Sequence, residues 1–80
     1  VHLPQALQQA AKAIAAGADV QTTLAAAEQA IIAGGFDSVD YLALTDVQSL
    51  ARLDRFDGHA RLLAAARMGA TRLLDNLAVD

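Results

Sequence analysis

Residues 60–76 read ARLLAAARMGATRLLDN, and the fold depends on the conformation of this stretch. Alanine, leucine and arginine are among the strongest helix formers, so intrinsic propensity favours a helix over residues 60–68. Gly69-Ala70 suits either the end of a helix or the turn of a hairpin. A strand with period-two alternation is supported more weakly, with Arg61 and Arg67 on one side and Leu62, Ala64, Ala66 and Met68 on the other.

Two amphipathic helices are predicted in the first half of the chain. Pro4 suits the first turn of the first helix, and Gly17 suits a left-handed residue just after its end. Asp19 can cap the second helix, which Gly34-Gly35 would end. The short turn between the helices predicts that they pack antiparallel. Their apolar faces would comprise Leu3, Leu7, Ala10, Ala11 and Ile14 in the first helix, and Val20, Leu24, Ala27 and Ile31 in the second.

The middle of the chain changes character. Val39, Tyr41 and Ala43 alternate with Asp40, Leu42 and Leu44, which predicts a short strand. Thr45-Asp46-Val47-Gln48 has the form of a helix capping box, so a helical turn is expected over residues 50–53. The charges and glycine of residues 52–59 indicate an exposed loop, from which Phe56 would pack back; the conformation of residues 51–59 is left open.

Composition limits the classes of protein to which the chain can belong. The chain has 80 residues, of which 55% are hydrophobic and 4% aromatic, with a net charge of −3. This length predicts a single domain, residues 1–80, with a small core. The acidic balance argues against nucleic acid as a partner, since phosphate backbones need a basic surface. No apolar run is long enough for a membrane span, no secretory signal is visible and cysteine is absent, so a cytoplasmic protein is expected.

The polar residues give few signals of chemistry. His2 and His59 have no partner at metal-ligand spacing, and no metal site is expected. Gly34-Gly35 lacks the lysine of a phosphate-binding loop. Asp37-Ser38 resembles the attachment motif of acyl and peptidyl carrier proteins, in which the serine carries phosphopantetheine at the start of a helix. The alternative is that both residues belong to a turn before a strand.

Arg72, Asp75 and Asn76 form the densest polar group among apolar neighbours. If residues 71–79 form a strand, Asp75 shares its face with Leu73, Leu77 and Val79. A carboxylate on a mostly apolar face needs partners, so an ion pair with Arg61, Arg67 or Arg72, or hydrogen bonds to turn amides, are expected. The other interpretation is that the group faces a second domain.

Residues 60–76 resemble the end of the C-terminal domain in the pantoate–β-alanine ligase family, the pantothenate synthetases, where a pattern RLL-AAR-G-TRL-DN closes a hairpin. A second match is Val39-Asp40-Tyr41-Leu42 followed by Asp46. The resemblance, and not the periodicity, favours two antiparallel strands around Gly69. The expected fold is therefore α+β, with two antiparallel helices packed on a small antiparallel sheet of about three strands.

The resemblance also implies a function. The family condenses pantoate with β-alanine, using ATP and Mg²⁺ and passing through a pantoyl-adenylate. Its histidine pair and its SSRN-like segment belong to a nucleotide-binding N-terminal domain or to its junction with this region, and nothing here matches them. The resemblance therefore implies no catalytic, cofactor-binding or metal-binding residue in this chain. It implies a lid over that domain. Because the chain has no phosphate-binding loop or adenylation motif, it is expected to be inactive alone. Because 55% of so short a chain is hydrophobic, some apolar area should stay exposed, which predicts weak self-association as a homodimer. A carrier protein modified at Ser38 and a ligand-free interaction module are the alternatives.

Overall fold

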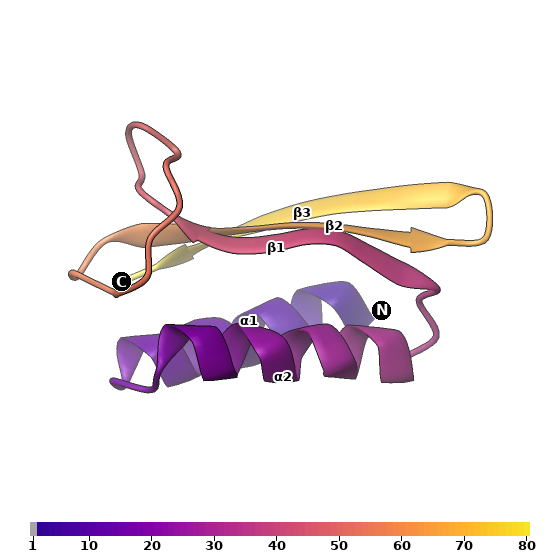
Figure 1. Cartoon of the computed structure of the whole chain (residues 1–80), viewed down its shortest axis with the longest axis horizontal. Helices are drawn as coiled ribbons and strands as arrows, with labels where there is room; N and C mark the ends of the chain where they lie inside the picture. The colour runs from indigo at the N-terminus through magenta and orange to yellow at the C-terminus, as the bar shows by residue number, and fades with distance from the viewer. Residues whose placement is uncertain (1) are drawn as a thin grey trace.

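Within residues 2–80, the part of the chain that the computed structural model describes, two helices lie beneath a three-stranded antiparallel sheet (Figure 1). The strand order is β1–β2–β3. The expected α+β fold is thereby confirmed. None of the described helices is long and apolar enough to cross a membrane. In chain order the elements are α1 (His2–Ala15), α2 (Val20–Ala33), β1 (Ser38–Thr45), β2 (Ala60–Met68) and β3 (Thr71–Val79).

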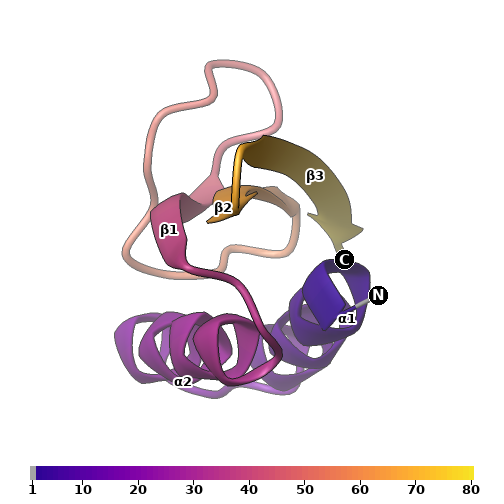
Figure 2. The same cartoon turned by 90° about the vertical axis from the view of Figure 1, so that its right-hand side faces the viewer.

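The two helices cover one face of the sheet. Figure 2 shows α1 beneath β3 and α2 beneath β1, with β2 above the space between the helices. Side chains of all five elements form one hydrophobic core there, because each helix turns its apolar stripe to the sheet. The stripes predicted for both helices are buried, with Leu24 half-buried at the margin. The largest fully buried side chains are Leu7, Ile14, Ile31, Leu44, Leu62 and Val79.

The helix ends follow the local signals. The N–H of Ala18 donates to Ala13 O at 2.9 Å and that of Gly17 to Ile14 O at 3.0 Å, which together close a Schellman motif around a Gly17 with φ of 101°. The carboxylate of Asp19 caps α2 by accepting from the N–H of Thr22 at 2.9 Å. Short-range hydrogen bonds thus fix the turn that makes the helices antiparallel.

Residues 60–79 form the hairpin that the family resemblance implied, against the helix that propensity favoured. Gly69 has a φ of 60° and the φ of Ala70 is not positive, which are the φ signs of a type II′ turn. Leu62, Ala64 and Ala66 are fully buried against the helices, and β2 pairs on both sides. This burial and two hydrogen-bonded neighbours outweigh a helix propensity of a few tenths of a kcal/mol per residue.

Strand β1 departs from the simple alternation expected for residues 39–44. Val39 pairs with Ala66 and Tyr41 with Ala65, so Asp40 is the extra residue of a β-bulge. The bulge shifts the in–out alternation of side chains by one residue. Val39, Leu42 and Leu44 can then all pack on the apolar core, whereas the charged Asp40 stays out of it. These three side chains consequently face the helices, and Tyr41 and Ala43 face the other way.

The capping box and helical turn expected after residue 45 are wrong. Thr45 belongs to β1, is 2% exposed, and its hydroxyl donates to Arg61 O at 3.0 Å. The carboxylate of Asp46 instead accepts from the N–H groups of Gln48 and Ser49, which closes a turn. Residues 46–59 then form a loop that returns to the sheet where Leu53 N donates to Leu44 O at 2.8 Å. Phe56 packs back on the core, as expected.

Candidate functional site

The sheet face opposite the helices is the main candidate surface, because neither helix covers it (Figure 1). The loop of residues 46–59 rises above this face at one end, and the β2–β3 hairpin extends beyond the helices at the other. Residues directly opposite in the register share a face of the sheet. We call this surface the open face: it comprises Tyr41, Ala43, Thr45, Arg61, Leu63, Ala65, Arg67, Arg72, Leu74, Asn76 and Ala78.

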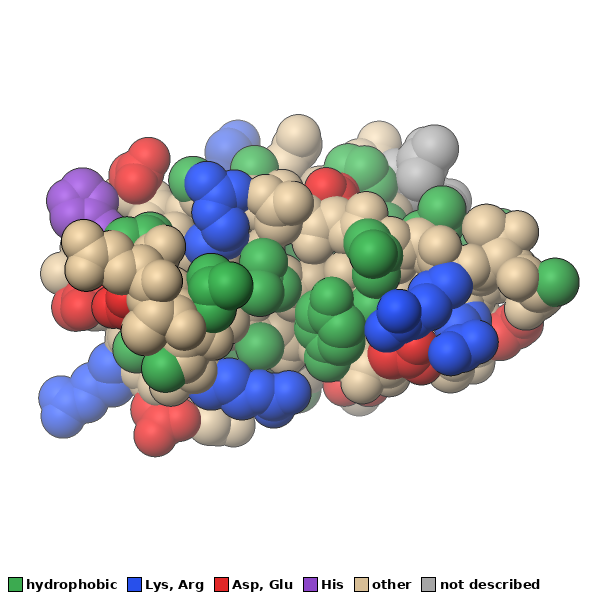
Figure 3. All heavy atoms as spheres, turned by 90° about the horizontal axis from the view of Figure 1, so that it is seen from above, with side chains coloured by type: hydrophobic (Ala, Val, Ile, Leu, Met, Phe, Trp, Pro, Cys, Tyr) green, Lys and Arg blue, Asp and Glu red, His purple; other side chains and the backbone are tan. Residues whose placement is uncertain are grey.

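The middle of the open face is apolar. Leu74 is 62% exposed, the largest exposed fraction among the large hydrophobic side chains of the described residues. Leu63 and Tyr41 beside it are half-buried. Figure 3 looks onto this face and shows hydrophobic side chains gathered between charged groups at either end. A contiguous apolar surface rimmed by charge is typical of a contact site.

Charged side chains gather at the hairpin end of the open face (Figure 3). Arg67 and Arg72 are directly opposite each other on β2 and β3. The Nε of Arg72 donates to Asp40 Oδ2 at 2.8 Å, and the Nε of Arg67 donates to both carboxylate oxygens at 3.1 and 3.2 Å. The hydrogen bond from Arg72, and then that from Arg67, holds the pKa of Asp40 below its usual range. We call Asp40, Arg67 and Arg72 the arginine–aspartate cluster.

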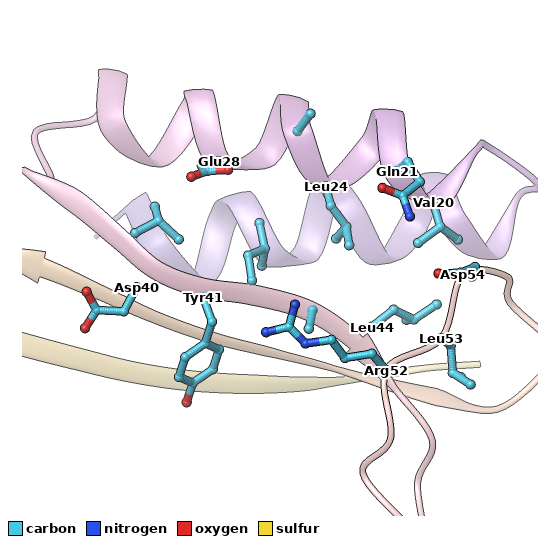
Figure 4. A pocket seen from close by; sticks show the side chains of 14 residues that line it. Val20, Gln21, Leu24, Glu28, Asp40, Tyr41, Leu44, Arg52, Leu53 and Asp54 are labelled. Carbon is cyan, nitrogen blue, oxygen red and sulfur yellow. The ribbon is translucent and has the colours of Figure 1, made fainter.

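A groove of about 460 Å³ lies between α2 and the outer edge of β1 (Figure 4). Gln21, Leu24 and Glu28 line it from α2, and Arg52 extends along β1 on the opposite side. Its carboxylates, from Glu28, Asp40 and Asp54, come from three separate segments. No hydrogen bond within residues 2–80 joins any two of them.

The structure separates the polar group that the sequence placed together at residues 72–76. Asp75 lies on the helix side with Leu73 and Leu77, as its parity predicted, while Arg72 and Asn76 lie on the open face. The expected ion pair of Asp75 is not what the structure shows. Arg72 bonds to Asp40, the side-chain carbonyl of Asn76 accepts from Arg61, and Asp75 accepts from the N–H of Asn76 at 2.8 Å. Alternation along β3 is the cause, since neighbouring side chains point to opposite faces.

The other candidate residues do not form a site. Ser38 begins a strand, whereas a carrier-protein serine begins a helix, so the carrier interpretation is wrong. Nδ1 of His59 lies 3.6 Å from a carboxylate oxygen of Asp80, with both side chains exposed. Within residues 2–80 no group of three or more His, Cys, Asp or Glu side chains is placed to hold a metal ion. The side chain of His2 lies outside the described part.

Two acids whose partners the sequence did not predict are central to the structure. Asp40 joins both arginines, and Asp37 accepts a hydrogen bond from the N–H of Gly69 at 2.6 Å. The partners lie far along the chain, at sequence separations of 27 and 32 residues. No local sequence pattern predicts contacts over such separations. The only sequence feature that drew attention to Asp40 was the family resemblance of residues 39–42.

Comparison with known proteins gives a consistent result. The family model described as pantoate-beta-alanine ligase matches residues 1–78. The chain is 68% identical to the pantothenate synthetase of Sphingopyxis alaskensis over 76 residues, covering 95% of this chain and 27% of that relative. It is 58% identical to the pantothenate synthetase of Rhizorhabdus wittichii, covering 98% of this chain and 28% of that one.

A solved structure agrees with these matches. The crystal structure of pantothenate synthetase from Thermus thermophilus superposes with a TM-score of 0.80 at 34% identity, covering 94% of this chain and 27% of that one. The chain therefore spans about a quarter of the length of the relatives it matches.

Proposed function

The chain belongs to the pantoate–β-alanine ligase family, and from this we propose that it serves as the lid domain of an ATP-dependent ligase that makes pantothenate. The partner would be the nucleotide-binding domain of the same enzyme, which binds ATP and Mg²⁺ together with pantoate and β-alanine. A cytoplasmic location is part of this proposal.

The proposed reaction has two steps. The carboxylate of pantoate attacks the α-phosphorus of ATP, which releases pyrophosphate and leaves a pantoyl-adenylate. The amine of β-alanine then attacks the acyl carbon, AMP leaves, and an amide forms. The adenylate is also open to attack by water, so a lid that closes over it before β-alanine reacts would protect the intermediate.

The observation that supports this role best is the open face. A three-stranded sheet covered on one side only leaves an apolar surface in water, and Leu74 at 62% exposure is its clearest member. Covering such a surface lowers the free energy by roughly 25 cal/mol for each Å² removed from water. We propose that the open face is the side that closes on the catalytic domain, and that the helix layer stays outside.

Within residues 2–80, the one side-chain hydroxyl that donates to a carboxylate is that of Thr22, in the cap of α2, so we propose that the chain contributes shape and exclusion of water. We therefore expect the 80-residue chain alone to make no pantothenate and to bind ATP with no micromolar affinity. Calorimetric titration with ATP and Mg²⁺ tests this directly.

The decisive experiment is a chimera. This chain would replace the matched region of the Sphingopyxis alaskensis enzyme, to which it is 68% identical, and pantothenate formation would be measured. The chimera should be active. Leu74→Asp on the open face should lower kcat and raise adenylate hydrolysis, measured as AMP released without pantothenate.

Ile32→Asp is the matched control, because Ile32 is also an exposed apolar residue, at 42%, but lies on α2. It should leave both rates unchanged. A folded but inactive chimera, or a Leu74→Asp enzyme indistinguishable from the Ile32→Asp enzyme, would contradict the proposal.

A further inference from the structure

We propose that Arg67 and Arg72 form a phosphate-binding site at the hairpin end of the open face. The inference rests on the proposed function only for the natural ligand, which would be the phosphate chain of the nucleotide. The capacity to bind a phosphate group is a property of this chain by itself.

The two guanidinium groups are placed as a pair by the sheet. Arg67 and Arg72 face each other across β2 and β3 one residue pair from the hairpin turn, so their Cβ atoms are about 5 Å apart. Their side chains are 55% and 45% exposed. A ligand reaching the open face would therefore meet both cations together.

Asp40 bonds to each arginine through the Nε of that arginine only. Each hydrogen bond in the cluster uses the Nε of the arginine, and no hydrogen bond within residues 2–80 uses the terminal nitrogens of either side chain. A guanidinium has five N–H donors, so the terminal donors of both groups remain for a second anion. Asp40 acts here as a positioning residue, set between the arginines by the β-bulge at Val39 and Tyr41.

The charge of the surroundings favours an anion. The chain carries a net charge of −3, yet the open face carries Arg61, Arg67 and Arg72 against Asp40 as the one acid of the cluster. The carboxylate of the other acid at this end of the sheet, Asp37, accepts from the N–H of Gly69 at 2.6 Å and makes no hydrogen bond to either guanidinium group within residues 2–80. The two guanidinium groups therefore share a single hydrogen-bonded carboxylate, an arrangement that favours attraction of an anion to this face.

Phosphate fits the pair better than a carboxylate. A carboxylate offers two oxygens in one plane, which match the fork of one guanidinium. A phosphate group offers three strongly accepting oxygens in a tetrahedral arrangement and can accept from two neighbouring guanidinium groups at once. The ligand class is therefore a phosphate or polyphosphate group.

The test is a titration of the 80-residue chain, labelled with ¹⁵N, with inorganic phosphate, pyrophosphate and acetate at constant ionic strength. Pyrophosphate should shift the Nε–H resonances of Arg67 and Arg72 and saturate in the low millimolar range, as expected for an exposed site. Arg67→Gln and Arg72→Gln should each weaken binding at least about threefold, since each removes one charge-assisted donor group. Arg72→Lys should bind pyrophosphate with an affinity between those of the unchanged chain and of Arg72→Gln, because lysine keeps the positive charge but lacks the planar pair of donors of a guanidinium.

Arg55→Gln is the control, since Arg55 lies in the exposed loop away from the cluster, and it should bind as the unchanged chain does. Non-saturating shifts, equal loss in the Arg55 variant, or acetate binding as well as pyrophosphate would overturn the proposal. Because the chimera measures lid closure and the titration measures phosphate binding by the chain alone, the two proposals fail separately.

Discussion

The carboxylate of Asp37 accepts a hydrogen bond of 2.6 Å from the backbone N–H of Gly69, which joins the segment after α2 to the turn of the hairpin. The N–H of Asp37 also donates to Arg67 O at 2.7 Å. One residue thus continues the β1–β2 ladder and fixes the turn that follows β2. This contact sets the hairpin end of the open face, where the arginine–aspartate cluster lies.

Replacing Asp37 with Ala should lower the free energy of unfolding by about 1 kcal/mol, because the turn N–H loses a charged acceptor. Urea denaturation followed by circular dichroism gives the value. Asp57→Ala is the control, since its carboxylate accepts only a long bond of 3.4 Å from His59 N in the exposed loop. Equal losses of unfolding free energy in the two variants would show that the hydrogen bond from Gly69 N–H contributes no more to stability than the long bond in the loop.

Gly69→Ala should destabilise the chain by about 1–2 kcal/mol, because φ is 60° at this position and an L-residue is strained there. Within residues 2–80, no atom outside the two adjacent residues lies within 4 Å of the Cβ that would be added, so the expected effect is conformational. D-alanine at position 69, introduced by chemical synthesis, adds the same methyl group without the strain. It should therefore be neutral or stabilising, and a loss equal to that of L-alanine would point to a steric cause instead.

Acid should weaken the arginine–aspartate cluster. The pKa of Asp40 is lowered from an ordinary value of 3.8, chiefly by the hydrogen bond from Arg72, so the unfolded chain binds this proton more readily than the folded one. The stabilisation is present above the unfolded pKa and is lost as the pH falls through the folded one, that is, below about pH 4. Asp40→Asn should be less stable than the unchanged chain at about pH 7, and the difference should shrink toward about pH 2. Denaturation midpoints across this range test the sign, and a constant difference would contradict it.

Asp75→Ala should change the free energy of unfolding by less than about 1 kcal/mol, since within residues 2–80 only the adjacent Asn76 N–H would lose its acceptor. A loss of several kcal/mol in urea denaturation would mean that the carboxylate satisfies donors beyond that amide. Ala78→Asp provides the comparison on the opposite face of the same strand, where the side chain is exposed.

The isolated chain should self-associate through the open face, because its apolar middle has no partner within the described residues. A two-fold dimer is the simplest closed arrangement, and the entropy of association opposes it by several kcal/mol, so the dimer should be weak. Sedimentation equilibrium should show a mass above 8.3 kDa as the concentration rises to the millimolar range. Leu74→Asp should abolish this rise and Ile32→Asp should not; a mass of 8.3 kDa throughout would refute the prediction.

Local chemistry was enough for the helical half of the fold. The cap at Asp19, the left-handed Gly17 and the buried stripes of α1 and α2 follow from interactions within a few residues, and each was predicted from the sequence. The end of α2 at Gly34-Gly35 also follows from its residues. These features depend on hydrogen bonds and periodicity that neighbouring residues determine together.

Tertiary structure decided the sheet. The residues of β2 favour a helix by themselves, and only the resemblance to a family predicted the hairpin; the strand is stable because β1 and β3 pair with it and the helices cover Leu62, Ala64 and Ala66. The bulge at Asp40, the use of Thr45 as a strand residue and the separation of Arg72 from Asp75 also depend on partners far along the chain. Strand pairing gains its free energy from residues that are distant in the sequence, so a local sequence pattern could not predict the sheet.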